Sequence, residues 1–142
     1  MSEKIIDLPE NYMPSDNESE YMNNFQLEYF RQKLIKWRDD LGEESKETID
    51  HLKHGKLNEP DLNHRASIET EVNFELRTRD RYRKLMNKIE AALHRIKTGN
   101  YGFCVKSFEP IGIKRLEARP IATLSIEAQE EHERTEKIYT DK

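Results

Sequence analysis

Two apolar stripes with helical spacing constrain the fold of this 142-residue chain more than any other feature. The first stripe consists of Phe30, Leu34, Trp37 and Leu41, at the spacings that are typical of a coiled-coil seam. The second stripe consists of Tyr82, Met86, Ile89, Leu93 and Ile96, at the same kind of spacing. Because each stripe covers only one narrow face of a helix, the pattern predicts two long helices that pack against each other.

The predicted helices extend from about residue 23 to residue 54 and from about residue 61 to residue 97. At about 1.5 Å per residue, each would be on the order of 45–55 Å long. Two helices joined by so short a linker must run antiparallel. The sequence therefore predicts a mostly α fold, in which a long antiparallel coiled-coil hairpin spans residues 23–98 and has its tip at residues 55–64.

The segments outside the hairpin have a different composition. Residues 1–22 contain many acidic residues together with Pro9 and Pro14, which predicts a flexible acidic tail. Residues 99–125 are rich in glycine and proline and predict a compact knob, whose candidate core residues are Phe103, Phe108, Ile111, Ile113, Leu116, Leu124 and Ile126. Residues 126–142 are expected to form a polar terminal helix, to about Lys137, and a tail.

Composition limits the location and the partners of the chain. Charged residues make up 37% and hydrophobic residues 35%, and no window approaches the apolar length that a membrane span needs. The amino terminus lacks the pattern of a secretory signal, so we expect a cytoplasmic protein. The formal net charge of −4 argues against general attraction to DNA phosphates, and we predict no direct sequence-specific DNA binding.

Cys104 is the single cysteine and stands first in an incomplete zinc-site pattern. The other three positions of a C-x2-C-x17-C-x2-C spacing hold Ser107, Ser125 and Ala128. Four cysteines at this spacing would strongly indicate tetrahedral zinc, but a serine hydroxyl is a poor ligand at neutral pH and alanine has none. From the ligand count we predict that the knob folds by apolar packing, that zinc is absent and that the protein has no other cofactor.

Several motifs, in the same order along the chain, resemble the DksA/TraR family of transcription regulators that bind RNA polymerase. They are Glu20-Tyr-Met-Asn23, Lys36-Trp37-Arg38, Glu75-Leu-Arg-Thr-Arg-Asp-Arg-Tyr-Arg-Lys-Leu85, Tyr101-Gly-Phe-Cys104 and Arg115-Leu-Glu-Ala-Arg-Pro120. The resemblance covers roughly residues 18–137. It implies a degenerate zinc-finger-like knob beside the hairpin, and a regulator that is not an enzyme.

The resemblance also implies a mode of action. Family members insert the hairpin into the secondary channel of RNA polymerase and change the stability of promoter complexes, in many cases with ppGpp during the stringent response. The acidic tip motif of the family matches this chain at Asp61 and Ala66, whereas His64 replaces the second acid. Histidine can carry a positive charge near neutral pH, so this exchange changes the chemistry of the tip.

Four further positions correspond to the ppGpp and polymerase interface of the family. Lys88 and Arg119 match basic residues that contact ppGpp, Leu85 matches a packing neighbour, and Gln129 replaces a lysine. Because two cations suit a tetraphosphate less well than three, we predict a weaker response to ppGpp. The resemblance places Arg81 at the rim of the polymerase channel. The alternative for the basic residues of the second helix is salt bridges with acids of the first, such as Asp39 and Glu43.

Other functions stay open as alternatives. The first is a paralog that occupies the channel, regulates weakly because of His64 and competes with other channel-binding factors. The second is a structural coiled-coil adaptor, which would form an obligate dimer, whereas the regulator is expected to be a monomer. At the tip, His51, His54, His64 and Asp61 could ligate a transition metal, although solvated histidines are the commoner case.

Overall fold

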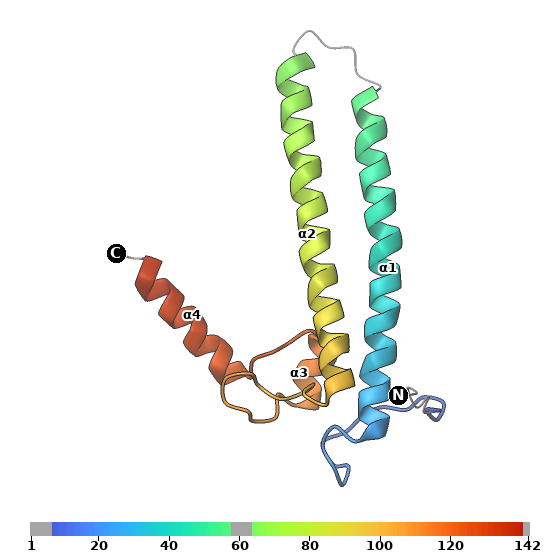
Figure 1. Cartoon of the computed structure of the whole chain (residues 1–142), viewed down its shortest axis with the longest axis vertical. Coiled ribbons are helices and arrows are strands. Elements are labelled where there is room, and N and C mark those ends of the chain that lie inside the picture. The colour runs from blue at the N-terminus through green and yellow to red at the C-terminus, as the bar shows by residue number, and fades with distance from the viewer. Residues whose placement is uncertain (1–6, 58–63, 141–142) are drawn as a thin grey trace. The chain divides into compact units, whose positions relative to one another are not determined.

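The computed structural model describes residues 7–57 and 64–140, with side chains for residues 7–54 and 69–138. Four helices follow one another along the chain (Figure 1): α1 (Asn24–Leu57), α2 (His64–Thr98), α3 (Ile113–Ala118) and α4 (Ile126–Thr140). Within the described ranges there is no β-strand, only one antiparallel bridge between Phe103 and Pro110. The predicted mostly α fold is confirmed.

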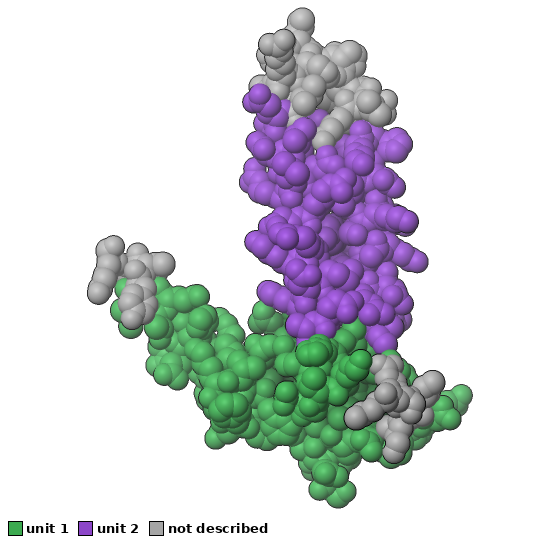
Figure 2. All heavy atoms as spheres, viewed as in Figure 1, with its two compact units in different colours: residues 1–34, 92–142 green, residues 35–91 purple. Residues whose placement is uncertain are grey.

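The chain divides into two compact units (Figure 2). Unit 1 comprises Met1–Leu34 and Ala92–Lys142, and unit 2 comprises Ile35–Ala91. Helices α1 and α2 each contribute to both units. No helix in the part of the chain that the structure describes has a stretch apolar and long enough to cross a membrane.

Unit 2 is the antiparallel helical hairpin that the apolar stripes predict. Arg38 of α1 forms an ion pair of 3.2 Å with Glu90 of α2, and Tyr82 of α2 donates a hydrogen bond of 3.3 Å to Thr48 of α1. Thr48 follows Arg38 along α1, whereas its partner Tyr82 precedes Glu90 along α2. The two helices therefore run antiparallel. Leu41 and Ile89 are buried in this hairpin.

Unit 1 contains most of the fully buried side chains, among them Phe30, Leu34, Tyr101, Cys104 and Leu116. The rings of Phe30 and Tyr101 lie 5.6 Å apart and join the start of α1 to the knob. Ile111, Ile113 and Leu116 are buried as predicted.

The core prediction was wrong for Phe108 and Ile126, which are 78% and 54% exposed. Phe108 ends the turn that follows Cys104 and adopts a positive φ of 61°. Its N–H donates to the Cys104 carbonyl at 2.9 Å. In this turn the small Cys104 side chain takes the buried position and the larger Phe108 ring faces solvent.

Residues 12–22 make specific contacts within unit 1, and we call them the amino-terminal strap. Tyr21 and Met22 contact the knob at Gly102, and Tyr12 donates to the Glu18 carboxylate at 2.7 Å. The sequence predicts a flexible acidic tail for residues 1–22; the contacts described here concern residues 12–22, and residues 1–6 lie outside the described residues. The acidic composition of this segment predicts that it buries little apolar surface. Tyr12, Tyr21 and Met22 nevertheless supply apolar side chains that pack within unit 1, which an average over the segment does not indicate.

Helix α3 has only six residues and was not predicted from the sequence. Gly112, with a φ of 103°, precedes it, and the Arg119 N–H closes it by donating to the Arg115 carbonyl at 2.7 Å. Arg115 also donates from its side chain to the Leu124 carbonyl at 2.9 Å. These bonds tie α3 to the segment that leads into α4.

Candidate functional site

The predicted tip residues lie at the edge of what the structure describes. Asp61 falls outside the described residues, and so does any metal site that includes it. His64 and Ala66 belong to the first turn of α2 as backbone, but their side chains are not described. Among the described residues, no group of three histidine, cysteine or acidic side chains is placed to hold a metal ion.

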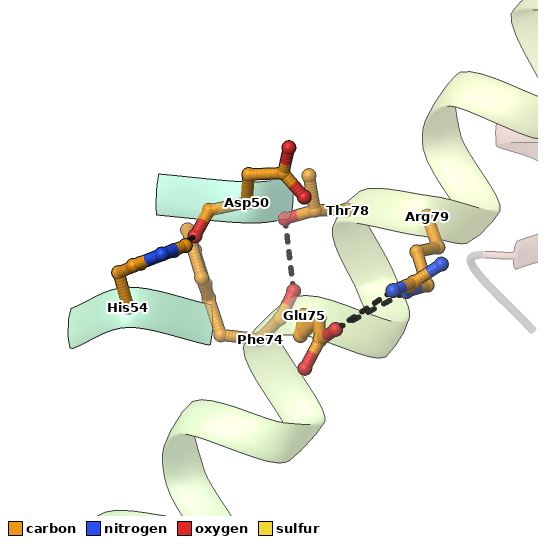
Figure 3. A network of polar contacts seen from close by, with 6 residues as sticks. All are labelled: Asp50, His54, Phe74, Glu75, Thr78 and Arg79. Atoms are coloured by element: carbon orange, nitrogen blue, oxygen red, sulfur yellow. Dashed lines mark hydrogen bonds and ion pairs between the residues drawn. The ribbon is translucent and has the colours of Figure 1, made fainter. Parts of the chain in front are cut away.

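In the part of the hairpin that leads to the tip, polar contacts form within each helix (Figure 3). Thr78 is buried, and its hydroxyl donates to the Phe74 carbonyl of the same helix at 2.8 Å. On α1, Nδ1 of His54 lies 2.7 Å from the Asp50 carbonyl. A carbonyl oxygen only accepts, so Nδ1 carries the proton in this bond. The exposed apolar residues of this region include Phe74 and Leu76.

The basic residues of α2 differ in whether they have acidic partners. Arg79 pairs with Glu75 at 3.0 Å, and Asp80 accepts from both Arg83 and Lys84. Together these two cations lower the pKa of Asp80. The partners lie on α2 itself, so these three ion pairs do not follow the predicted pattern of bridges to α1.

Arg81 and Lys88 are exposed, and among the described residues neither has an ion-pair partner. Leu85, between them in sequence, is half-buried. Within the described residues, no acid therefore competes for these two cations. Helical spacing in the sequence could have indicated this distinction, because Glu75 stands four residues before Arg79 and Asp80 three before Arg83, whereas Arg81 has no acid at these spacings.

The other two predicted interface residues belong to unit 1. Arg119 follows α3 with an exposed side chain, and within the described part of the chain it has no ion-pair partner. Gln129 lies in the first turn of α4, where its amide donates to Glu133 at 3.0 Å. The four predicted interface residues are thus divided equally between the units: Leu85 and Lys88 in unit 2, Arg119 and Gln129 in unit 1.

The four zinc-pattern positions are brought together in unit 1. Burial raises the pKa of the Cys104 thiol, but hydrogen bonds from the Ser107 side chain and from the backbone of Ser107, Ser125 and Lys106 outweigh it and lower the pKa to about 6. The Ser125 hydroxyl in turn accepts from the Ala128 N–H at 3.2 Å. A sulfur surrounded by N–H and O–H donors is stabilised as thiolate.

Sequence reasoning missed the residues that hold the strap, above all Gln26, which is 1% exposed. Its side chain accepts from the Met22 N–H at 2.7 Å and donates to Ser15 and Glu18. Apolar periodicity cannot indicate a buried glutamine. One signal was available, because Asn23 followed three residues later by Gln26 is close to the capping-box pattern that begins a helix.

Comparison with known proteins identifies the relatives of this chain. Residues 26–96 match the family described as DnaK suppressor protein DksA, N-terminal domain. Residues 99–134 match the prokaryotic dksA/traR C4-type zinc finger. A curated relative from Caulobacter vibrioides, RNA polymerase-binding transcription factor DksA, is 54% identical over 130 residues that cover 92% of this chain and 91% of the relative.

Two further relatives carry the same DksA name. RNA polymerase-binding transcription factor DksA of Escherichia coli K12 is 44% identical over 110 residues, which cover 78% of this chain and 73% of the relative. The solved structure of transcription factor DksA2 from Pseudomonas aeruginosa has a TM-score of 0.76 and 36% identity, and the match covers 86% of this chain and 94% of that one.

The zinc-finger match contradicts the prediction that zinc is absent. That prediction rested on the number of cysteine thiols alone. The match extends over the whole knob and the start of α4, and it places this segment in a C4-type zinc-finger family. The side chains at the four positions of this chain are one thiol, two hydroxyls and one methyl, which do not fit a four-thiolate site. No step of the function proposed below therefore passes through a metal.

The two family models together match most of residues 26–134, and the Caulobacter vibrioides relative extends the similarity to nearly the whole chain. The first model covers most of α1 and nearly all of α2, and the second covers the turn-rich knob and the first part of α4. This chain belongs to the DksA/TraR family.

Proposed function

We propose that this protein is a cytoplasmic, non-enzymatic transcription regulator that binds RNA polymerase. The observation that carries the proposal is the similarity over 92% of the chain to a protein named RNA polymerase-binding transcription factor DksA. Family members use the hairpin to enter the secondary channel of the polymerase, and the same role is proposed for α1 and α2 here. Promoter complexes would then change in stability when the tip residues Asp61, His64 and Ala66 reach the active centre.

The distribution of ion pairs on α2 supports a specific set of polymerase contacts. Arg79 pairs with Glu75, and Arg83 and Lys84 share the carboxylate of Asp80, so all three cations already have an acidic partner on their own helix. Arg81 and Lys88 have no such partner among the described residues, so forming a new ion pair breaks none. We assign Arg81 to the channel rim and Lys88, with Leu85, Arg119 and Gln129, to the interface for ppGpp and polymerase.

The response to ppGpp is proposed to be weak. Gln129 stands where the family has a lysine, and its amide is engaged with Glu133. An amide supplies no net charge to a tetraphosphate, so only Lys88 and Arg119 remain as cations of this interface. Transcription with and without ppGpp tests this point, and Gln129→Lys is expected to strengthen the response.

His64 favours a second candidate function, a paralog that occupies the channel and regulates weakly. The first acid of the tip motif is present as Asp61, but the second is replaced by an imidazole. If the tip acts through negative charge, His64→Asp increases inhibition at a ribosomal promoter. The paralog would instead compete with other channel-binding factors without strong inhibition of its own.

A coiled-coil adaptor would need its seam for a second chain. In this chain Leu34, Leu41 and Ile89 are at most 4% exposed without any partner, so the seam is already used internally. We therefore propose a monomer. Size-exclusion analysis that gave an obligate dimer would contradict this part of the proposal.

The decisive experiment is binding of the purified protein to core RNA polymerase, followed by transcription from a ribosomal promoter. We expect association with the polymerase and a shorter lifetime of promoter complexes. Arg81→Ala should weaken binding more than Arg83→Ala, which removes a cation that already pairs with Asp80. Absence of any association with core polymerase would refute the proposal.

A further inference from the structure

A single hydroxyl of the strap joins the two ends of one loop of the knob. Tyr21 donates its O–H to the Gly102 carbonyl at 2.7 Å and accepts the Gly112 N–H at 2.9 Å. Gly102 and Gly112 lie just outside the ends of the bridge that pairs Phe103 with Pro110. The ring of Tyr21 also packs edge-on against Phe103, with centroids 5.4 Å apart. Tyr21 therefore closes the loop from the outside with both its ring and its hydroxyl.

The neighbouring residue packs closely against the same loop. Met22 is buried, and a Cβ at Gly102 would lie 2.7 Å from Met22 Cγ and 2.8 Å from Sδ. Gly102 has a φ of 90°, which favours glycine independently of the close approach. The absence of a side chain at residue 102 is what allows the strap to lie against the backbone of the knob.

The strap is itself held on the start of α1. Gln26 accepts from the Met22 N–H at 2.7 Å and donates to the Ser15 carbonyl at 3.1 Å. Glu18 accepts from both Gln26 and Asn23 at 2.7 Å. Because these bonds tie Ser15, Glu18 and Met22 to the first turn of α1, Tyr21 is not a side chain on a free tail.

Helix α3 is held by a tyrosine hydroxyl at each end. Tyr21 binds the N–H of Gly112, which precedes the helix, and the buried Tyr101 donates to the Pro120 carbonyl, which follows it, at 2.8 Å. Between Pro120 and α3 lies Arg119. The geometry at both ends therefore determines where the Arg119 backbone lies within unit 1.

We propose that the amino-terminal strap, residues 12–22, fixes the knob and positions Arg119, with Tyr21 as the positioning residue. Both family models omit this segment, because they match residues 26–96 and 99–134. A role for Arg119 in binding polymerase rests on the proposed function, whereas the fixing of the knob by the strap is independent of it.

The first test measures hydrogen exchange of the full-length protein alone. Tyr21→Phe keeps the ring and removes only the hydroxyl, so the Gly112 amide loses its acceptor. We expect amides of residues 112–118 to exchange about three- to tenfold faster, the effect of one or two lost hydrogen bonds on local opening. Tyr82→Phe is the matched control, because it removes a tyrosine hydroxyl whose partner, Thr48, lies in unit 2. Unchanged exchange at residues 112–118 in Tyr21→Phe would overturn the proposal.

The second test asks whether Tyr21 acts through Arg119. Polymerase affinity is measured for Tyr21→Phe, Arg119→Ala and the double variant. If Tyr21 positions Arg119, Tyr21→Phe weakens binding about three- to tenfold in the parent chain and has little further effect once Arg119 is removed. Fully additive effects would overturn the positioning role. If the parent chain fails to bind polymerase, the proposed function fails, and the exchange experiment still decides whether the strap fixes the knob.

Discussion

Glu18 accepts hydrogen bonds from three side chains in a segment that composition alone describes as an acidic tail. The donors are the Tyr12 hydroxyl and the side-chain amides of Asn23 and Gln26. The bond from Tyr12, with those from Asn23 and Gln26, lowers the pKa of Glu18 below the usual 4.5 even though burial acts in the opposite direction. Burial and the bond to Glu18 also raise the pKa of Tyr12 to about 12, so this hydroxyl stays protonated and donates throughout the neutral range.

This carboxylate makes the stability of unit 1 sensitive to acid. Because the folded-state pKa of Glu18 is lowered, its contribution is complete above the usual carboxyl pKa and is lost as the pH falls through the folded-state value. Glu18→Gln should lower the free energy of unfolding by about 1 kcal/mol at neutral pH. The difference from the parent should shrink as thermal unfolding is measured from about pH 6 to about pH 3.

Glu20→Gln is the control for this prediction, because it removes an exposed carboxylate from the same segment. Its effect on the unfolding temperature should be small at every pH. A constant difference between Glu18→Gln and the parent chain across the acid range would contradict the assigned role of Glu18.

Residue-level prediction from the sequence succeeded where burial follows apolar periodicity. Phe30, Leu34, Leu41 and Ile89 were predicted on the seam and are buried. It failed at Gln26 and Phe108, for opposite reasons. Gln26 is buried because its hydrogen bonds are satisfied inside the strap. Phe108 is exposed because it lies in a turn with positive φ, which places its ring in solvent. Neither bond geometry nor turn type is encoded in hydropathy.

At the scale of elements, the contact between strap and knob can be tested with two glycines. Gly99 and Gly102 both have positive φ, at 83° and 90°, but a Cβ added at Gly99 would have no neighbour within 4 Å, whereas one at Gly102 would meet the strap. Gly99→Ala should cost about 1–2 kcal/mol for the backbone conformation alone. Gly102→Ala should cost about 1–3 kcal/mol more, because Met22 has to move.

A double-mutant cycle separates that contact from backbone strain. In a Met22→Ala background, the shorter side chain leaves room for the new methyl group, so Gly102→Ala should cost at least about 0.5 kcal/mol less than in the parent chain. Gly99→Ala should cost the same in both backgrounds. Equal costs for the two glycine variants, measured by chemical denaturation, would show that the strap does not press on Gly102.

The long elements could be predicted from the sequence, whereas the short ones could not. Helices α1 and α2 extend through many turns, so their apolar repeat defines them within a few residues at each end. Helix α3 has six residues, fewer than two turns, and its ends are set by tertiary hydrogen bonds to Tyr21 and Tyr101. The strap has no periodicity, because its structure depends on contacts with residues far along the chain.

The whole molecule distributes its buried residues unevenly between the two units. Unit 1 contains Phe30, Leu34, Tyr101, Cys104 and Leu116, all at most 1% exposed. In unit 2 the apolar contacts weaken towards the tip. Among the described side chains of residues 42–54 and 69–81, Thr78 alone is buried. Local stability follows local burial, so the part of the hairpin nearest the tip should open most readily.

Hydrogen exchange measured across the full-length chain tests this gradient. Amides near Leu41 and Ile89 and those of unit 1 should be the most protected, and amides of residues 45–54 and 70–81 the least. Leu41→Ala should cost roughly 2–5 kcal/mol and raise exchange mainly within residues 35–91, while Leu116→Ala should raise it mainly within residues 92–118. If either variant raised exchange equally in both ranges, the chain would open as one cooperative body. Equal protection of residues 45–54 and 70–81 and of the amides near Leu41 and Ile89 would contradict the predicted gradient, because local opening would then not follow local burial.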